Sequence, residues 1–141
     1  MEIAGISVEY GSRNKSTGNM SDKPVAERLQ VKGERRLAVV GATPALERLI
    51  GVKKARAEAG EADVVLLFVA DRAAFDAKLP GLLRKMRKDA ILWVGYPKLT
   101  SKLAADLSRD VIHKLAPGHG LDTVSQIAID DDWSALRLKQ I

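Results

Sequence analysis

A chain of 141 residues with 46% hydrophobic content, and two each of Trp, Tyr and Phe, can build one compact domain with an aliphatic core, but not two. The absence of cysteine excludes a disulfide framework, a thiolate zinc site and a cysteine nucleophile, and it favours the cytoplasm. The net charge of +5 gives only weak support for nucleic-acid binding because the 23 basic residues are spread along the chain, and no apolar run approaches the roughly 20 residues that span a bilayer.

The N-terminal segment differs in character from the rest of the chain. Glycine, serine, asparagine and threonine crowd together in residues 1–22, with little periodic apolar content. This composition predicts a disordered leader, followed by a single domain over residues 23–141. Met20 resembles a start of translation as much as an interior residue, so either Met1 or Met20 could begin the natural chain.

A short helix is the first predicted element of the domain. It starts at Pro24, with Ser21 or Asp22 as its cap, and ends by Gly33. The continuous aliphatic run Leu37–Val40 then predicts a buried strand.

A helix over Pro44–Ile50 follows that strand, with Thr43 as its cap and Gly51 at its left-handed end. The segment Val52–Gly60 is ambiguous, because it is made of helix formers but falls where a short edge strand would fit. We interpret it as a strand. The wholly apolar run Val64–Val69 predicts a strand that helices cover on both faces, as in a parallel sheet.

Two more helices are predicted from apolar residues spaced three or four apart. Asp71 caps the first, and Pro80 inside it predicts a kink or a one-turn break. A buried strand over Ile91–Tyr96 comes next, and the second helix follows Lys98. The core face of the first helix is Phe75, Leu79, Leu82, Leu83 and Met86; that of the second is Leu99, Leu103, Leu107, Val111 and Leu115. On the second helix, Lys102, Asp106, Arg109 and His113 form a solvated polar stripe.

The C-terminal segment changes the pattern. Thr123–Ile129 and Ser134–Leu138 read as two strands joined by only four residues, which predicts an antiparallel hairpin. Strands that alternate with helices give an α/β, Rossmann-like three-layer sandwich, and the hairpin closes its mostly parallel sheet with one reversed strand. This arrangement looks like a class I methyltransferase topology with one strand and helix pair missing.

Three segments carry a resemblance to a known family: ADVVLLFV, LWVGYPKLTS with LAADLSRD behind it, and IAIDDDWSALRLKQ. From Pro24 to Gln140 the chain resembles the bacterial proteins labelled domain of unknown function three thousand and fifty-two. The most specific parts are the triplet that begins at Tyr96 and the acidic turn before Trp133. The resemblance implies a small Rossmann-like fold and no established activity.

A methyltransferase or dehydrogenase needs glycines at the first strand-to-helix turn, and usually an acid at the end of the second strand to hold ribose hydroxyls. The turn Gly41–Pro44 offers one glycine and then a proline. Glu58 and Glu61 are near the second strand's end, but neither stands plainly there. We therefore expect no bound cofactor, and cofactor-dependent catalysis is a minority interpretation.

A ligand in an open parallel sheet binds beyond the carboxyl ends of the strands. If the reversed strand lies next to Ile91–Tyr96, the acidic turn of the hairpin meets the Tyr96–Lys98 turn at that edge. The candidate ligand-binding residues are Thr43, Asp71, Tyr96, Lys98, Ser101, Asp131, Asp132 and Trp133.

Each of these candidates also has a structural interpretation. Lys98, with Thr100 or Ser101 at the start of a helix, could bind an anion, or Lys98 could pair with Asp131 or Asp132. We favour the ion pair. The three consecutive aspartates could coordinate magnesium, but adjacent acids in a hairpin are more often turn residues, so we expect no metal site.

The main functional hypothesis from the sequence is a non-catalytic Rossmann-like module that binds a small anionic ligand or a protein partner. A second copy of the chain is a candidate partner, through an exposed sheet edge or helix face. The alternatives are a divergent or vestigial methyltransferase-like enzyme and, on charge alone, a nucleic-acid-binding protein, although we expect neither nucleic acid nor a membrane as a partner.

Overall fold

Five strands form one sheet in the order β1-β2-β3-β5-β4 in the computed structural model, which describes residues 24–52 and 55–141. The predicted leader, with the candidate caps Ser21 and Asp22, lies outside these residues. The strands are β1 (Leu37–Val40), β2 (Val64–Phe68), β3 (Ile91–Pro97), β4 (Leu121–Ala128) and β5 (Trp133–Gln140). The chain is therefore a mixed α/β protein, as its sequence predicts.

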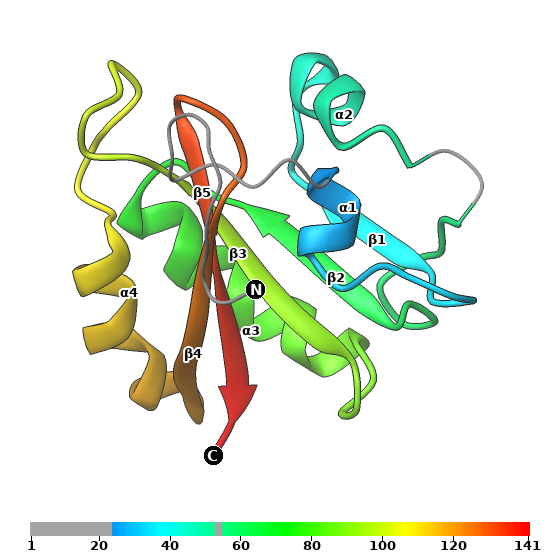
Figure 1. Cartoon of the computed structure of the whole chain (residues 1–141). Helices are drawn as coiled ribbons and strands as arrows, with labels where there is room; N and C mark the ends of the chain where they lie inside the picture. Colours follow the sequence, from blue (N-terminus) through cyan, green and yellow to red (C-terminus); the bar gives the residue numbers. More distant parts are fainter. Residues whose placement is uncertain (1–23, 53–54) are drawn as a thin grey trace.

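The first three strands are parallel, because each begins a strand-to-helix unit that returns the chain to the same end of the sheet. All five residues of β2 are buried, which explains its wholly apolar sequence. Its side chains alternate between two hydrophobic cores. Val65 and Leu67 face one core, with the helix after β2, and Leu66 and Phe68 face the other, with the helices before and after β1. Helices therefore cover both faces of the sheet (Figure 1).

Two predicted helix caps are confirmed. Helix α2 (Pro44–Ile50) starts where Thr43 Oγ1 accepts a hydrogen bond from the Leu46 amide, and α3 (Arg72–Lys85) starts where Asp71 Oδ1 accepts one from the Ala74 amide. The first helix, α1 (Val25–Arg28), has Pro24 at its N-cap position and is only one turn long.

The predicted break at Pro80 is absent, because α3 continues through it as a single helix. No helix in the described part of the chain is long and apolar enough to cross a membrane.

The segment predicted as a strand over Val52–Gly60 makes only a one-residue parallel bridge, between Arg56 and Leu37. The Leu37 amide donates to Ala55 O at 2.8 Å, and the Ala57 amide donates to Leu37 O at 3.1 Å. A turn at Glu58 then leads the chain away. Charged side chains and alanine offer little to pack on an edge strand, so the bridge stays short.

The region after β3 differs most from its prediction. The helix expected directly after Lys98 begins only at Arg109, and Ser108 caps it; this helix is α4 (Arg109–Leu115), followed by the 3₁₀ helix η2 (Ala116–His119). Leu99 and Leu103, assigned to the core face, are 71% and 50% exposed. We name residues 98–108 the β3–α4 loop.

Side chains of this loop bond to segments distant in sequence, and these bonds compete with a helix. Ser101 Oγ donates to Asp132 Oδ1 at 2.8 Å and accepts from the Leu103 amide at 3.0 Å, and Asp106 Oδ1 accepts from the Arg72 amide at 2.8 Å. The predicted polar stripe is therefore wrong, because only two of its four members lie on α4.

The last two strands run in opposite directions. β5 lies between β3 and β4 and is antiparallel to both, with Tyr96 opposite Ser134 and Pro97 opposite Trp133. Asp130 Oδ1 accepts from the amides of Asp132 and Trp133, at 2.9 and 2.8 Å, which closes the turn between β4 and β5. That turn lies at the same edge of the sheet as the carboxyl ends of β1, β2 and β3.

Candidate functional site

The carboxyl edge of the sheet has a topological switch point between β1 and β2. Helix α2 leaves β1 on one face of the sheet, and α3 leaves β2 on the other face (Figure 1). Ligands of open α/β sheets bind beyond the strand ends at such a point. We call residues 41–43 and 69–71 the switch-point edge; it contains two of the predicted site residues, Thr43 and Asp71.

Thr43 and Asp71 both have a structural role as helix caps. The ammonium group of Lys78 also lies close to this edge. A Cβ built on Gly41 would lie 3.9 Å from Lys78 Nζ, so an ammonium group of α3 approaches the turn after β1. The same Cβ would lie 2.7 Å from the carbonyl oxygen of Phe68. Only glycine therefore lets the end of β1 approach β2 this closely.

The acidic hairpin turn lies against the β3–α4 loop. The Lys98 amide donates to Asp132 O at 2.8 Å, and Ser101 fastens the same aspartate through its side chain. The favoured ion pair is absent: among residues 24–52 and 55–141, none joins Lys98 to Asp131 or Asp132. The Lys98 side chain instead lines a pocket.

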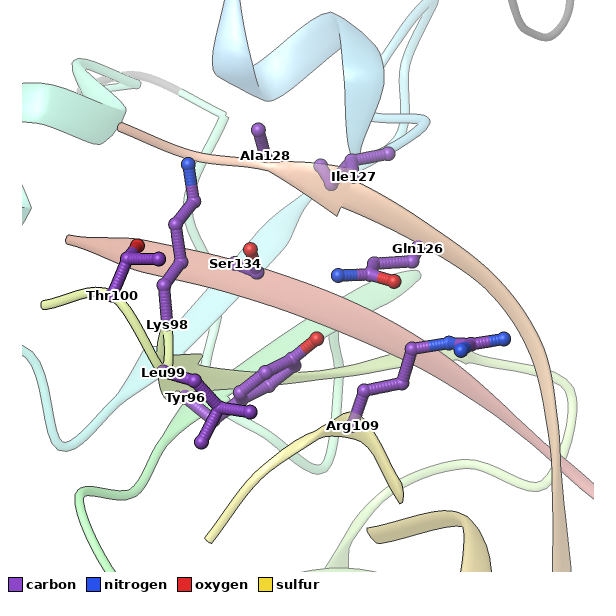
Figure 2. Close-up of a pocket in the computed structure, with 9 residues that line it drawn as sticks. All are labelled: Tyr96, Lys98, Leu99, Thr100, Arg109, Gln126, Ile127, Ala128 and Ser134. Carbon is purple, nitrogen blue, oxygen red and sulfur yellow. The ribbon is translucent and has the colours of Figure 1, made fainter. Parts of the chain in front are cut away.

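The pocket has a volume of about 410 Å³ and lies between the β3–α4 loop, the start of α4 and the strands of the hairpin (Figure 2). We call it the loop pocket. Two of the eight predicted site residues, Tyr96 and Lys98, line it. Its lining is Tyr96, Lys98, Leu99, Thr100, Arg109, Gln126, Ile127, Ala128 and Ser134.

The other predicted residues lie elsewhere and serve the fold. Trp133 packs edge-to-face on Phe68, with ring centroids 5.3 Å apart, and does not line the loop pocket. Asp132 and Ser101 hold the loop to the hairpin, and Asp131 is exposed in the turn. In the described residues, no group of three or more His, Asp or Glu side chains is placed to hold a metal ion.

Tyr96 is the most unusual group of the loop pocket. Its side chain is 3% exposed, and its hydroxyl is buried without a hydrogen-bond partner among the described residues. Burial raises the pKa of Tyr96 to about 12, and the charge of Arg109 and the neighbouring side chains of Ser134 and Gln126 oppose this rise. The phenol therefore stays protonated at neutral pH, and it is a donor without a hydrogen bond of good geometry beside the pocket.

Most of the lining residues were not predicted, and three of these are polar groups near Tyr96. Arg109 comes from the start of α4, and Gln126 and Ser134 come from β4 and β5. Ser134 is only 3% exposed, and a serine at the start of an apolar strand is the one sequence signal that marks it. Arg109 and Gln126 look like ordinary surface residues, so only the folded structure assigns them to the pocket.

The pKa of Tyr96 leads to a prediction about alkaline pH. The unfolded chain loses this proton near pH 10, whereas the folded chain holds it until about pH 12. The contribution of protonated Tyr96 to the free energy of unfolding is therefore fully present below pH 10, and it is lost as the pH rises toward 12. We expect a loss of about 1 kcal/mol, reduced by solvent screening.

The measurement is urea unfolding at pH 9 and pH 11.5 for the wild type and Tyr96→Phe. The difference between the two proteins removes the contribution of lysines. Tyrosinate absorption of the wild type minus that of the variant gives the pKa of Tyr96 directly. A difference titration centred at the ordinary value near 10 would show that the hydroxyl is not desolvated.

Comparison with known proteins gives the fold of the chain and no family. No family model matches it, and no curated protein matches it; the resemblance to domain of unknown function three thousand and fifty-two stays a prediction. A ribosomal protein L11 methylase from Lactobacillus delbrueckii subsp. bulgaricus has a similar structure, with a TM-score of 0.51 and 10% identity. The match covers 81% of this chain and 73% of the methylase.

Two further solved structures are similar over a smaller share of their length. They are LepI in complex with SAM, with a TM-score of 0.45 and 8% identity, and a pericyclic reaction enzyme, with a TM-score of 0.46 and 9% identity. Each match covers 83% of this chain and 39% of the other.

The likeness to the methylase corrects the main functional hypothesis. The sequence favoured a non-catalytic module because the cofactor fingerprint fails at the turn after β1. A methylase with a TM-score of 0.51 shares the fold of this chain, so the fold fits the methyltransferase-like alternative better than the non-catalytic module.

Proposed function

We propose that this chain is a divergent methyltransferase-like enzyme. The observation that carries the proposal is the methylase-like fold, in which a parallel sheet ends in a hairpin with one reversed strand. In this interpretation the chain has a shortened methyltransferase topology. The one-residue bridge at Arg56 stands where the sheet of a complete Rossmann fold continues beyond β1.

A methyl donor such as S-adenosylmethionine supplies an electrophilic methyl group when it is bound. The switch-point edge offers groups that fit a nucleoside donor. Gly41 and Thr43 are exposed, so a ligand can reach the turn after β1. Asp71 uses Oδ1 to cap α3, and its Oδ2 bonds to none of the described residues, so it can accept from ribose hydroxyls or an ammonium group.

The chain differs from a complete Rossmann fold at the edge strand beside β1. A Rossmann sheet usually places a ribose-binding acid at the end of the strand beside β1. Here that strand is a single bridge, and the chain turns away at Glu58 before it reaches the carboxyl edge. Asp71, at the end of β2, would therefore take over the role of the acid.

Equilibrium dialysis with S-adenosylmethionine labelled at its methyl group tests the proposal. We expect the full chain to retain the label. Asp71→Asn should weaken retention about tenfold, because asparagine still caps the helix but removes the charge. Asp122→Asn is the matched control, since Asp122 is exposed at the opposite edge of the sheet and bonds only to the next amide.

Three outcomes are distinguishable. Retention that is lost in Asp71→Asn and kept in Asp122→Asn supports the donor site. Equal retention by all three proteins places the donor elsewhere and contradicts the role of Asp71. If no label is retained even at millimolar donor, the methyltransferase proposal is wrong.

A further inference from the structure

The loop pocket contains a buried hydroxyl, that of Tyr96, which forms no hydrogen bond of good geometry within the described residues, although Ser134 and Gln126 lie close enough to act on its pKa. A buried hydroxyl without a partner costs about 1–3 kcal/mol, so native structures rarely keep one without a reason. Tyr96 comes from β3, and its hydroxyl points into the space between Gln126, Ser134 and Arg109 (Figure 2). An acceptor atom of a ligand in this space would complete the hydrogen bonding of Tyr96.

The groups around that hydroxyl are also suited to an acceptor. Ser134 carries a buried hydroxyl on β5, and Gln126 carries an amide on β4, and both lie on the same side of the ring as the Tyr96 hydroxyl (Figure 2). Each can donate a hydrogen bond. Three neutral donors from three adjacent strands therefore converge on one end of the pocket.

Two cations flank the donors. Lys98 and Arg109 stand on opposite sides of Tyr96; Lys98 begins the β3–α4 loop and Arg109 is the first residue of α4 (Figure 2). Asp110 contacts Arg109 at 3.8 Å but is 92% exposed, so screening by water makes this pair weak. Asp132 lies near Lys98, where its Oδ1 accepts from Ser101 Oγ, and it does not line the pocket. Both charged side chains in the lining of the pocket are therefore cations, which favours an anionic group beside the Tyr96 hydroxyl.

The remaining wall is apolar. Leu99, Ile127 and Ala128 line it, and Leu99 is 71% exposed. An exposed leucine at the mouth of a pocket gains burial when an apolar group covers it. The volume of about 410 Å³ lies within the ordinary range for sites of small organic molecules, roughly 300–1,000 Å³.

We propose that the loop pocket binds a small organic carboxylate, with its carboxylate on Tyr96 between Lys98 and Arg109 and its apolar body against Leu99 and Ile127. This site goes beyond the methyl-donor proposal, because the loop pocket and the switch-point edge have no residue in common. The two proposals can therefore fail separately.

The test uses benzoate as the charged probe and benzamide as its neutral analogue of the same shape. Chemical shifts in a ¹H–¹⁵N spectrum of the full chain follow each titration. We expect benzoate to shift the amides of the β3–α4 loop, β4 and the start of β5, and to bind at least tenfold more tightly than benzamide, because a charged acceptor strengthens each hydrogen bond.

Variants then separate the roles of the lining residues. Tyr96→Phe keeps the ring and removes the hydroxyl, so its stability at neutral pH should equal or exceed that of the wild type, while its benzoate affinity falls about tenfold. Arg109→Met should weaken benzoate to a similar extent and leave benzamide unchanged. Lys139→Met is the matched control: it removes the same charge from an exposed residue outside the loop pocket, and it should change neither titration.

The proposal is overturned by any of three results. Benzoate at tens of millimolar shifts no amide of the loop pocket; benzamide binds as tightly as benzoate; or Tyr96→Phe binds benzoate as tightly as the wild type. The last result would mean that Ser134, Gln126 or water, and not a ligand, satisfies the Tyr96 hydroxyl. Retention of S-adenosylmethionine is measured separately, so its loss or persistence does not affect this test.

Discussion

Replacing Gly41 by alanine is expected to lower the free energy of unfolding by about 3 kcal/mol, because two costs add. Gly41 has φ +81°, a conformation that L-residues with a side chain rarely adopt. The new methyl group would also lie 2.7 Å from the carbonyl oxygen of Phe68, which is backbone of the central sheet and cannot rotate away. Relief of the clash requires β1 and β2 to separate at the switch-point edge.

Gly120→Ala is the matched control for this prediction. Gly120 has φ +75°, but a Cβ there has no atom within 4 Å among the described residues. The free energy of unfolding of Gly120→Ala should therefore fall only by the cost of the backbone conformation, about 1 kcal/mol. Urea unfolding monitored by circular dichroism measures both variants. Equal losses at the two positions would show that the contact with Phe68 is relieved at no cost.

Replacing Trp93 by alanine should lower the free energy of unfolding by about 3–5 kcal/mol. Trp93 is 2% exposed and lies in the core that joins α1 and α2 to the sheet. Its indole Nε1 donates to the carbonyl oxygen of Leu29 at 2.9 Å, which fastens the segment after α1 to β3. Alanine removes the ring and the hydrogen bond together. Circular dichroism in urea again measures the loss.

Trp93→Phe separates the two contributions. The aromatic ring is kept, but the Leu29 carbonyl loses its partner, so we expect a loss of about 1–3 kcal/mol. Trp133→Phe is the control, because Trp133 is only half-buried and its indole nitrogen makes no hydrogen bond within the described residues. Hydrogen exchange of the Leu29 amide, which bonds to Val25 O, should accelerate only in the Trp93 variants. Unchanged exchange in Trp93→Phe would mean that α1 is held by packing alone.

Local sequence signals were sufficient where an element depends on its own residues. The aliphatic runs of β1, β2 and β3 each predict a strand, because runs of four to seven apolar residues have the length of a strand and are short for a helix. Thr43 and Asp71 specify helix starts because a capping side chain needs only the amide three residues ahead. These elements were predicted with their ends within one or two residues.

Local signals failed in the β3–α4 loop, although its leucines have helical spacing. Helical spacing of apolar residues leads to a stable helix only if another part of the protein covers the apolar face. No described segment buries Leu99 and Leu103. Ser101 and Asp106 bond instead to Asp132 and Arg72, which are 31 and 34 residues away in sequence. Such distant bonds leave no trace in a window of ten or fifteen residues.

The candidate site follows the same division. Tyr96 and Lys98 were predicted because they end a strand at the carboxyl edge, where ligands of α/β sheets bind. Arg109 and Gln126 were missed because each reaches the pocket only through the loop and the hairpin. The acidic turn was predicted to lie beside Lys98, and it does, but it is held by Ser101 and by the Lys98 amide, which leaves the lysine side chain on the pocket wall.

By itself, the sequence determined the class of fold, the three parallel strands and the edge of the sheet at which a site is expected. The spacing of apolar residues and the capping of helices are properties of residues close together in the chain. The fold class and the parallel strands could be predicted from these properties. Tertiary structure alone decided that the edge strand beside β1 shrinks to one bridge, that the β3–α4 loop forms no helix, and that the Tyr96 hydroxyl is buried beside Ser134 and Gln126. Each of these three outcomes depends on the free energy of contacts between segments far apart in the chain. The spacing of residues in the sequence does not predict that free energy.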